Sequence, residues 1–301
     1  DDSAVNYTAI GIYRVYYRVS DAAGNEAEES INVNVTYETI APTIEGLTEF
    51  LPVSSTAHMI FASAISHNEA DEFVKMFQVS IQFGAILSVV FLFWKKFFDF
   101  KTYTFYLKLG LAVIPALVLG KLFDDKIEAV LEKPVPIAIV LILGGIVLVF
   151  IDRLFKNPVI NKEEEVTVKK AIVIGFWQCL AMMPGTSRSA ASIIGGMQQG
   201  LTRKMAAEFS FLLAVPTMLA VTLYSIFLKD WNYKGLEQKG YEMILSSNHN
   251  LIVFILGNII AFVVAAFAIK FFIGFLEKFG FKIWGYYRII VGFALLLYFS
   301  L

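Results

Sequence analysis

Two glutamates four residues apart, Glu45 and Glu49, are the first residues in the chain whose spacing suggests chemistry. On a helix both carboxylates would lie on one face, one turn apart. Because the flanking residues are largely apolar, two negative charges there must share a proton or hold a cation between them. A hard divalent cation, Mg²⁺ or Ca²⁺, prefers oxygen ligands and would also bridge to a phosphate. The alternative is a pair at the water interface, where acids near a helix start are ordinary.

Hydroxyls and an imidazole follow directly, in the segment Pro52-Val-Ser-Ser-Thr-Ala-His58. Ser54, Ser55 and Thr56 could bind phosphate oxygens or attack phosphorus, and His58 could serve as base, acid or nucleophile. The alternative is that the hydroxyls cap a helix that begins after Pro52 and that the histidine is structural.

A second polar segment, Met183-Pro-Gly-Thr-Ser-Arg-Ser-Ala-Ala-Ser192, is more specific. Proline and glycine break a helix, so free N–H groups at the start of the next helix are ready for an anion. Arg188 adds a planar fork that matches phosphate, and Ser187, Ser189 and Ser192 add hydroxyls. A buried arginine needs a partner, which could be Glu45 or Glu49, a pyrophosphate, or each in turn.

The elements that must position these groups are membrane helices. Hydrophobic residues make up 57% of the 301 residues, charged residues 17%, and mean hydropathy is +0.65, which is typical of a multi-span membrane protein. The net charge of -1 gives no basic surface for nucleic acid. Six apolar stretches approach the roughly 20 residues that span a bilayer. They lie near residues 73–93, 105–123, 136–151, 208–228, 251–272 and 283–301.

Two further apolar segments, 44–66 and 171–199, are interrupted by the polar motifs. Broken backbone at membrane depth must line protein or a cavity, so both are expected to be re-entrant helices. Each precedes three spans, and Pro52-Val-Ser-Ser55 resembles Pro184-Gly-Thr-Ser187. The halves, about 41–151 and 171–301, are therefore predicted to be inverted repeats with a site at their interface. Basic loop residues such as those in 95–101 orient the first broken segment to open from outside.

Residues 1–40 differ from the rest and are predicted to be a separate segment before a membrane domain at 41–301. Alternating residues on either side of Asp21-Ala-Ala-Gly-Asn25 predict one β-hairpin. The segment resembles the closing strands of immunoglobulin-like repeats in bacterial surface proteins. The predicted fold class is thus an all-α integral membrane protein with a short N-terminal β-hairpin.

The polar motifs carry a family resemblance. Glu45-Gly-Leu-Thr-Glu-Phe-Leu-Pro-Val-Ser-Ser-Thr-Ala-His58 resembles the E/Q-G-x-T-E-F-L-P-x-S-S-x-G-H motif of the undecaprenyl pyrophosphate phosphatases, the BacA/UppP family. Pro184–Ser192 resembles their second motif, and the likeness runs from about residue 44 to the C-terminus. Ala57 and Ala190 stand where the family usually has glycine, and Ser192 stands for threonine.

The resemblance implies a metal-dependent phosphatase in the bacterial inner membrane, with its site facing the periplasm. Such an enzyme recycles the lipid carrier of cell-wall synthesis and lowers sensitivity to bacitracin. By the resemblance, Glu45 and Glu49 would hold the metal or activate the attacking group, and Ser55 and His58 would lie beside the phosphorus. Ser187, Arg188 and the hydroxyl at 192 would clamp the pyrophosphate.

Two other functions are alternatives. Inverted repeats with broken helices are typical of transporters, so a flippase for a lipid-linked phosphate is an alternative. A type-2 phosphatidic acid phosphatase would need a histidine shortly after Ser187-Arg188, and the next one is His249. The expected partners are undecaprenyl pyrophosphate and the lipid bilayer, and a homodimer stays open.

Overall fold

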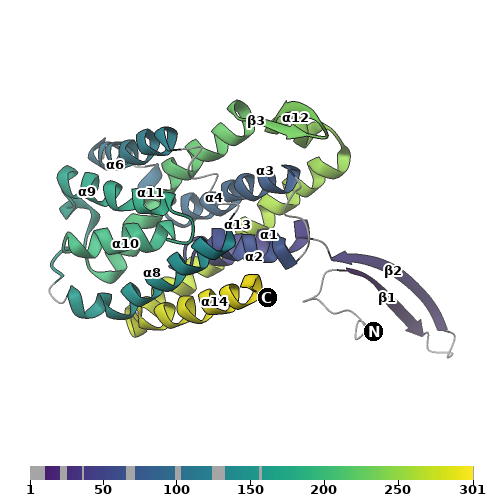
Figure 1. The fold of residues 1–301 in the computed structure, drawn as a ribbon, viewed down its shortest axis with the longest axis horizontal. Helices are drawn as coiled ribbons and strands as arrows, with labels where there is room; N and C mark the ends of the chain where they lie inside the picture. The colour runs from purple at the N-terminus through teal and green to yellow at the C-terminus, as the bar shows by residue number, and fades with distance from the viewer. Residues whose placement is uncertain are drawn as a thin grey trace.

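The computed structural model describes residues 11–20, 26–35, 37–65, 72–98, 103–123, 133–155 and 158–300. They form a helical body from which one β-hairpin projects (Figure 1). The elements before residue 160 are β1 (Gly11–Ser20), β2 (Glu26–Val35), α1 (Tyr37–Thr48), α2 (Ser55–Ile65), α3 (Glu72–Ser80), α4 (Gln82–Leu92), α5 (Trp94–Phe97), α6 (Tyr103–Leu122) and α8 (Pro134–Leu154). The later ones are η1 (Glu163–Glu165), α9 (Val168–Gln178), η2 (Cys179–Met182), α10 (Arg188–Gln198), α11 (Arg203–Leu223), η3 (Tyr224–Leu228), β3 (Asp230–Tyr233), β4 (Leu236–Lys239), α12 (Gly240–Leu245), α13 (Asn248–Phe279) and α14 (Lys282–Ser300).

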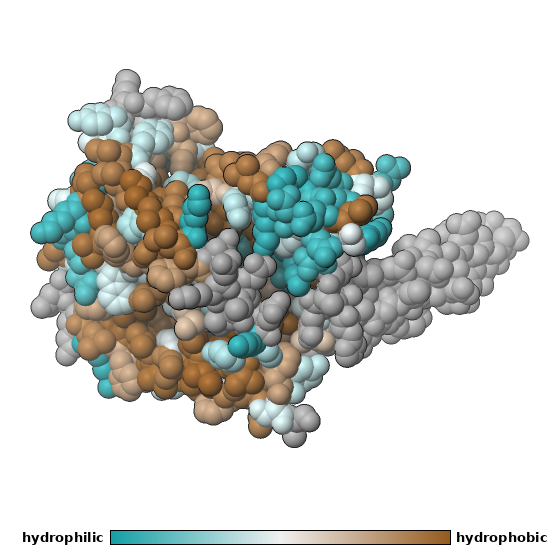
Figure 2. Space-filling model, turned by 45° about the horizontal axis from the view of Figure 1, so that its top comes forward, coloured by the Kyte–Doolittle hydropathy of each residue, from teal (hydrophilic) through white to brown (hydrophobic). Residues whose placement is uncertain are grey.

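Six helical stretches in the described part of the chain are long and apolar enough to cross a membrane. They are Glu72–Leu92, Tyr103–Leu122, Pro134–Leu154, Arg203–Leu228, Asn248–Phe279 and Lys282–Ser300. The six predicted spans are confirmed to within a few residues at most ends, and the all-α membrane class with them. Apolar side chains cover most of the visible surface of the helical body, with a hydrophilic patch near β3 and α12 (Figure 2). Such a surface is stable in lipid and would aggregate in water.

Both polar motifs interrupt helices, as predicted. The first lies between α1 and α2, and the second follows α9 and η2 and leads into α10. In each case the chain folds back, because α1 packs on α2 and α9 packs on α10. Pro42 lies inside α1, where a proline removes one helix hydrogen bond.

The two halves exchange helices. The first broken segment packs through α1 on α13 of the second half, and the second packs through α9 on α6 of the first. The third spans, α8 and α14, pack on each other and lie side by side in Figure 1. Their closest approach is reciprocal, since a Cβ on Gly145 would lie 2.8 Å from the carbonyl oxygen of Gly285, and one on Gly285 would lie 2.7 Å from that of Gly145. The pairing is reciprocal between the two predicted halves, and their inverted relation stays a prediction.

The hairpin prediction is also confirmed. Strands β1 and β2 pair antiparallel from Gly11 with Val35 to Ser20 with Glu26, and the predicted turn at 21–25 lies outside the described residues. A second hairpin, β3 with β4, was not predicted within the polar loop 229–250. It turns on Lys234 and Gly235, both with positive φ, which suits a tight two-residue turn.

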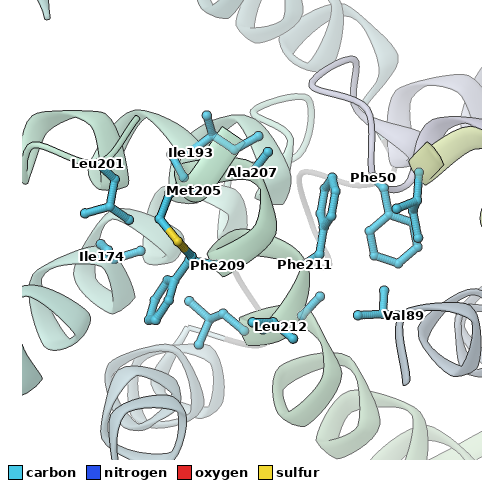
Figure 3. Close-up of a cluster of buried hydrophobic side chains, with 14 of the residues drawn as sticks. Phe50, Val89, Ile174, Ile193, Leu201, Met205, Ala207, Phe209, Phe211 and Leu212 are labelled. Carbon is cyan, nitrogen blue, oxygen red and sulfur yellow. The ribbon is translucent and has the colours of Figure 1, made fainter. Parts of the chain in front are cut away.

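The first polar motif is anchored in the largest buried apolar cluster, drawn in Figure 3. Phe50 lies edge to face against Phe211 of α11, with ring centroids 5.3 Å apart. Both rings are fully buried. The residue directly after Glu49 therefore fixes this turn against a helix of the other half.

Arg288 of α14 ties the two motifs together. Its Nη1 donates to the carbonyl oxygens of Pro52 at 3.1 Å and Thr186 at 2.9 Å, and its Nη2 donates to that of Gly185 at 2.8 Å. Its Nε donates to Leu141 of α8 at 3.2 Å, and the side chain has no solvent exposure. One guanidinium thus satisfies carbonyls that the broken helices leave free.

We expect Arg288→Leu to lower the free energy of unfolding by about 3 kcal/mol or more, because several buried carbonyls would lose their donor. The melting temperature in detergent should fall accordingly. Arg153→Leu is the matched control, since Arg153 is an exposed arginine near the end of α8. Equal melting temperatures for the two variants would contradict the role given to Arg288.

Candidate active site

Each broken helix restarts behind a serine with an unusual backbone. Ser54 precedes α2 and Ser187 precedes α10, with φ of 70° and 73°. The Ser54 hydroxyl accepts from the N–H of Ala57 at 3.4 Å, and the Ser187 hydroxyl accepts from that of Ala190 at 3.3 Å. Both serines are therefore N-caps, which for Ser54 is the alternative that the sequence left open. Left-handed backbone at such residues is costly and is characteristic of functional sites.

The helix caps align the two polar motifs differently from the likeness between Pro52–Ser55 and Pro184–Ser187, and the shift is one residue. Ser54 is two residues after Pro52, whereas Ser187 is three residues after Pro184. The caps align Ser54 with Ser187, not Ser55 with Ser187. Ser55 then corresponds to Arg188, so equivalent positions in the two halves carry a hydroxyl and a guanidinium.

Glu49 joins the two motifs through an ion pair. Its Oε1 accepts from Nη2 of Arg188 at 3.0 Å, and its Oε2 accepts from the hydroxyl of Ser55 at 2.5 Å. Arg188 also donates to the carbonyl oxygen of Ser210 at 2.9 Å and lies over the ring of Phe50. A carboxylate that holds a serine hydroxyl beside a guanidinium combines a base, a nucleophile and an anion-binding group.

Glu45 lies one helical turn before Glu49, as the spacing predicted. It is only 1% exposed, and its Oε1 has no hydrogen-bond partner among the described residues. Burial, and then the carboxylate of Glu49, raise the pKa of Glu45 well above its ordinary value. The pair therefore favours one shared proton or a bound cation over two free charges.

The His58 ring is held between the backbone of Ser54 and the side chain of Tyr287. Its Nδ1 lies 2.8 Å from the carbonyl oxygen of Ser54, and its Nε2 lies 2.8 Å from the hydroxyl of Tyr287 on α14. Because a carbonyl only accepts, Nδ1 carries the proton and Tyr287 donates to Nε2. Burial lowers the pKa of His58, which favours this neutral form.

The remaining predicted hydroxyls divide into two groups. Ser54, Ser55, Thr56 and Ser187 line the same cavity as Glu49 and Arg188, with a volume of about 520 Å³. Ser189 instead donates to the carbonyl oxygen of Leu51 at 2.8 Å, which links the two motifs. Ser192 lies 2.6 Å from the hydroxyl of Ser210. The contacts of these two buried serines are with protein.

The cavity has polar residues that the sequence analysis missed. Gln178 at the end of α9 is 2% exposed and donates from Nε2 to the hydroxyl of Thr217 at 3.1 Å, while its Oε1 has no partner among the described residues. Gln82 and Tyr224 also line the cavity. Neutral residues such as these carry no charge that would mark them in the sequence.

Arg288 on α14 was also missed in the sequence analysis, although a lone arginine within a membrane span indicates a structural or functional role.

The oxygen atoms present suit a hard divalent cation. Within the described residues, no group of three or more His, Cys, Asp or Glu side chains lies close enough to bind a metal ion. Glu45 and Glu49 offer carboxylate oxygens, including the unpartnered Oε1 of Glu45. Mg²⁺ is commonly held by one or two carboxylates, with substrate phosphate and water completing its shell, so the two glutamates fit such an ion.

Comparison with known proteins gives one family. The family model of the bacitracin resistance protein BacA matches residues 39–294. The undecaprenyl-diphosphatase of Flavobacterium psychrophilum is 53% identical over 254 residues, which cover 84% of this chain and 92% of that protein. The undecaprenyl-diphosphatase of Porphyromonas gingivalis is 49% identical over 266 residues, which cover 83% of this chain and 91% of that protein. The undecaprenyl-diphosphatase of Campylobacter jejuni is 46% identical over 267 residues, which cover 88% of this chain and 94% of that protein. This chain therefore belongs to the bacitracin resistance protein BacA family.

Proposed function

We propose that this chain is an undecaprenyl pyrophosphate phosphatase, which releases inorganic phosphate from the lipid and leaves undecaprenyl phosphate. The observation that carries the proposal is the cavity in which Glu49, Ser55 and Arg188 meet from two broken helices. The relatives named as undecaprenyl-diphosphatases support the substrate. A transporter or flippase is not favoured, because these relatives are named for the hydrolysis.

In the first chemical step the Ser55 oxygen attacks the terminal phosphorus, and Glu49 takes the serine proton across their hydrogen bond. The bond from that phosphorus to the bridging oxygen breaks, so undecaprenyl phosphate leaves. Water then attacks the serine-bound phosphoryl group, and the bond from phosphorus to the Ser55 oxygen breaks. Glu49 returns its proton to the departing Ser55 oxygen, and the proton of the water stays on the released inorganic phosphate. Glu49 is thus the base in the first step and the acid in the second.

Arg188 exchanges one anion for another during this cycle. Without substrate its Nη2 is paired with Glu49, which keeps a buried guanidinium compensated. A terminal phosphate beside Ser55 would present a second anion within reach of the same fork. The positive charge then stabilises the negative charge that develops on the phosphoryl oxygens in the transition state.

His58 acts in this scheme by holding the backbone. Its Nδ1–H donates to the carbonyl oxygen of Ser54, whose φ is positive, and Tyr287 fixes the opposite ring nitrogen. The next residue, Ser55, is the nucleophile. By holding the carbonyl group of Ser54, the imidazole helps to fix the backbone that positions Ser55. The roles of Ser189 and Ser192 are similar, since both link the second motif to neighbouring elements.

Glu45 and Glu49 would hold a Mg²⁺ or Ca²⁺ ion. Such an ion would neutralise charge on the pyrophosphate and lower the barrier to attack. Burial and the carboxylate of Glu49 raise the pKa of Glu45, so a cation between the two carboxylates would relieve their repulsion.

The proposed location of the site is supported by the charge of the loops. The spans place the chain in a bilayer, and the basic loops, such as the one holding Lys95 and Lys96, favour the cytoplasmic side. We therefore place the protein in the inner membrane with the first broken segment and the cavity open to the periplasm. All of the proposed groups come from one chain, so a homodimer is compatible with the scheme but not required by it.

Glu49→Gln should lower phosphate release from undecaprenyl pyrophosphate by about 100-fold or more, because the base and the Arg188 partner are lost together. Ser55→Ala should lose at least as much. Purified protein in detergent with added Mg²⁺ would be assayed for inorganic phosphate. Glu277→Gln, which breaks an exposed pair with Lys204, is the control and should keep its rate. Unchanged release in Glu49→Gln and Ser55→Ala would refute the site.

Glu45→Gln should weaken cation binding while preserving the fold, because the amide resembles the protonated acid. Added Mg²⁺ should raise the melting temperature of the wild type. In Glu45→Gln we expect the Mg²⁺ concentration that gives half of this rise to be about 10-fold higher. The exposed Glu164→Gln is the control. A wild-type Mg²⁺ dependence in Glu45→Gln would remove this glutamate from the cation site.

A further inference from the structure

The cavity has two chemically different ends. Its polar end holds Glu49, Ser55 and Arg188, as described above. The residues that line the cavity from α6, η2 and α11 are mostly apolar, with Lys121 and Thr217 as the polar exceptions. The apolar members, which together are the apolar wall, include Ala116, Leu117, Gly120, Ala181, Ala220 and Val221. A pyrophosphate gains nothing from these apolar members, whereas an alkyl chain does.

The apolar wall continues onto the outer surface of the protein. Leu117 on α6 and Val221 and Tyr224 at the end of α11 line the cavity and are each 44% exposed. Leu180 and Met183, which are adjacent in sequence to cavity-lining residues, are 52% and 49% exposed. Only 28% of the apolar stretch of α6 is buried inside the protein. The cavity therefore borders the surface that the spans present to lipid.

We infer that the wall between α6 and α11 binds the first isoprene units of the substrate and directs the rest of the chain sideways into the bilayer. This inference rests on the proposed function. A cavity of about 520 Å³ is of the size that holds a small molecule. It cannot enclose a whole undecaprenyl chain, so most of the chain must leave it. An apolar exit beside the polar end keeps the chain in lipid while the pyrophosphate reaches Ser55.

Gly120 offers a direct way to fill this wall. A Cβ built at Gly120 meets only the Cε of Met182, at 3.9 Å, so a larger side chain can enter the cavity without moving backbone. Gly110 lies on the same helix, is exposed, has no atom within 4 Å of a built Cβ and is not part of the cavity. Gly110→Phe is therefore a matched control for Gly120→Phe.

The experiment measures kcat/KM for phosphate release from undecaprenyl, farnesyl and dimethylallyl pyrophosphate, which share a headgroup and differ in chain length. For the wild type we expect kcat/KM to rise with chain length. Gly120→Phe should lose about 10-fold or more on the undecaprenyl substrate and less than about 2-fold on the dimethylallyl one. Gly110→Phe should match the wild type on all three. Ala220→Leu, which fills the wall from α11, should repeat the pattern of Gly120→Phe.

Equal losses on all three substrates, or an undiminished undecaprenyl rate, in both Gly120→Phe and Ala220→Leu would overturn the inference. So would a chain-length-dependent loss in Gly110→Phe. If the wild type releases phosphate from none of the substrates, the proposed function fails instead, so the two failures are distinguishable.

Discussion

The site depends on one ion pair, between Glu49 and Arg188, made across the interface of the two halves. Both side chains are largely buried, at 8% and 12% exposure, so neither charge can be left alone. The pair can form only if two broken helices bring their turns together. The requirement to compensate these charges therefore fixes how the two motifs meet.

The rest of the fold holds those two turns in place. Arg288 donates to carbonyls of both turns, Phe50 packs on Phe211 of the other half, and Ser189 donates to Leu51. These contacts stabilise strained backbone at Ser54 and Ser187. A preformed site of this kind does not need to reorganise when charge develops on the phosphate.

Much of this arrangement could be predicted from the sequence, because membrane helices and helix breakers are local signals. The lengths of the apolar stretches predicted the six membrane spans, and Pro52 and Pro184 predicted the two interruptions of helices. Partners distant in the chain could not be predicted in the same way. Nothing near His58 in sequence indicates Tyr287, and a four-residue likeness could not reveal that Ser54, not Ser55, matches Ser187. The neutral Gln178 lacks any local signal, because its place beside the cavity is shown only by its contact with Thr217, which is distant in the chain.

A double-mutant cycle on Glu49 and Arg188 tests the central claim most directly. The measured quantity is kcat/KM for phosphate release by Glu49→Gln, Arg188→Met and the double variant, each compared with the wild type. If the two groups act as one unit, the double variant should be about as slow as the slower single variant. Losses that multiply would show that the two side chains act independently, and would contradict a site built on their pairing.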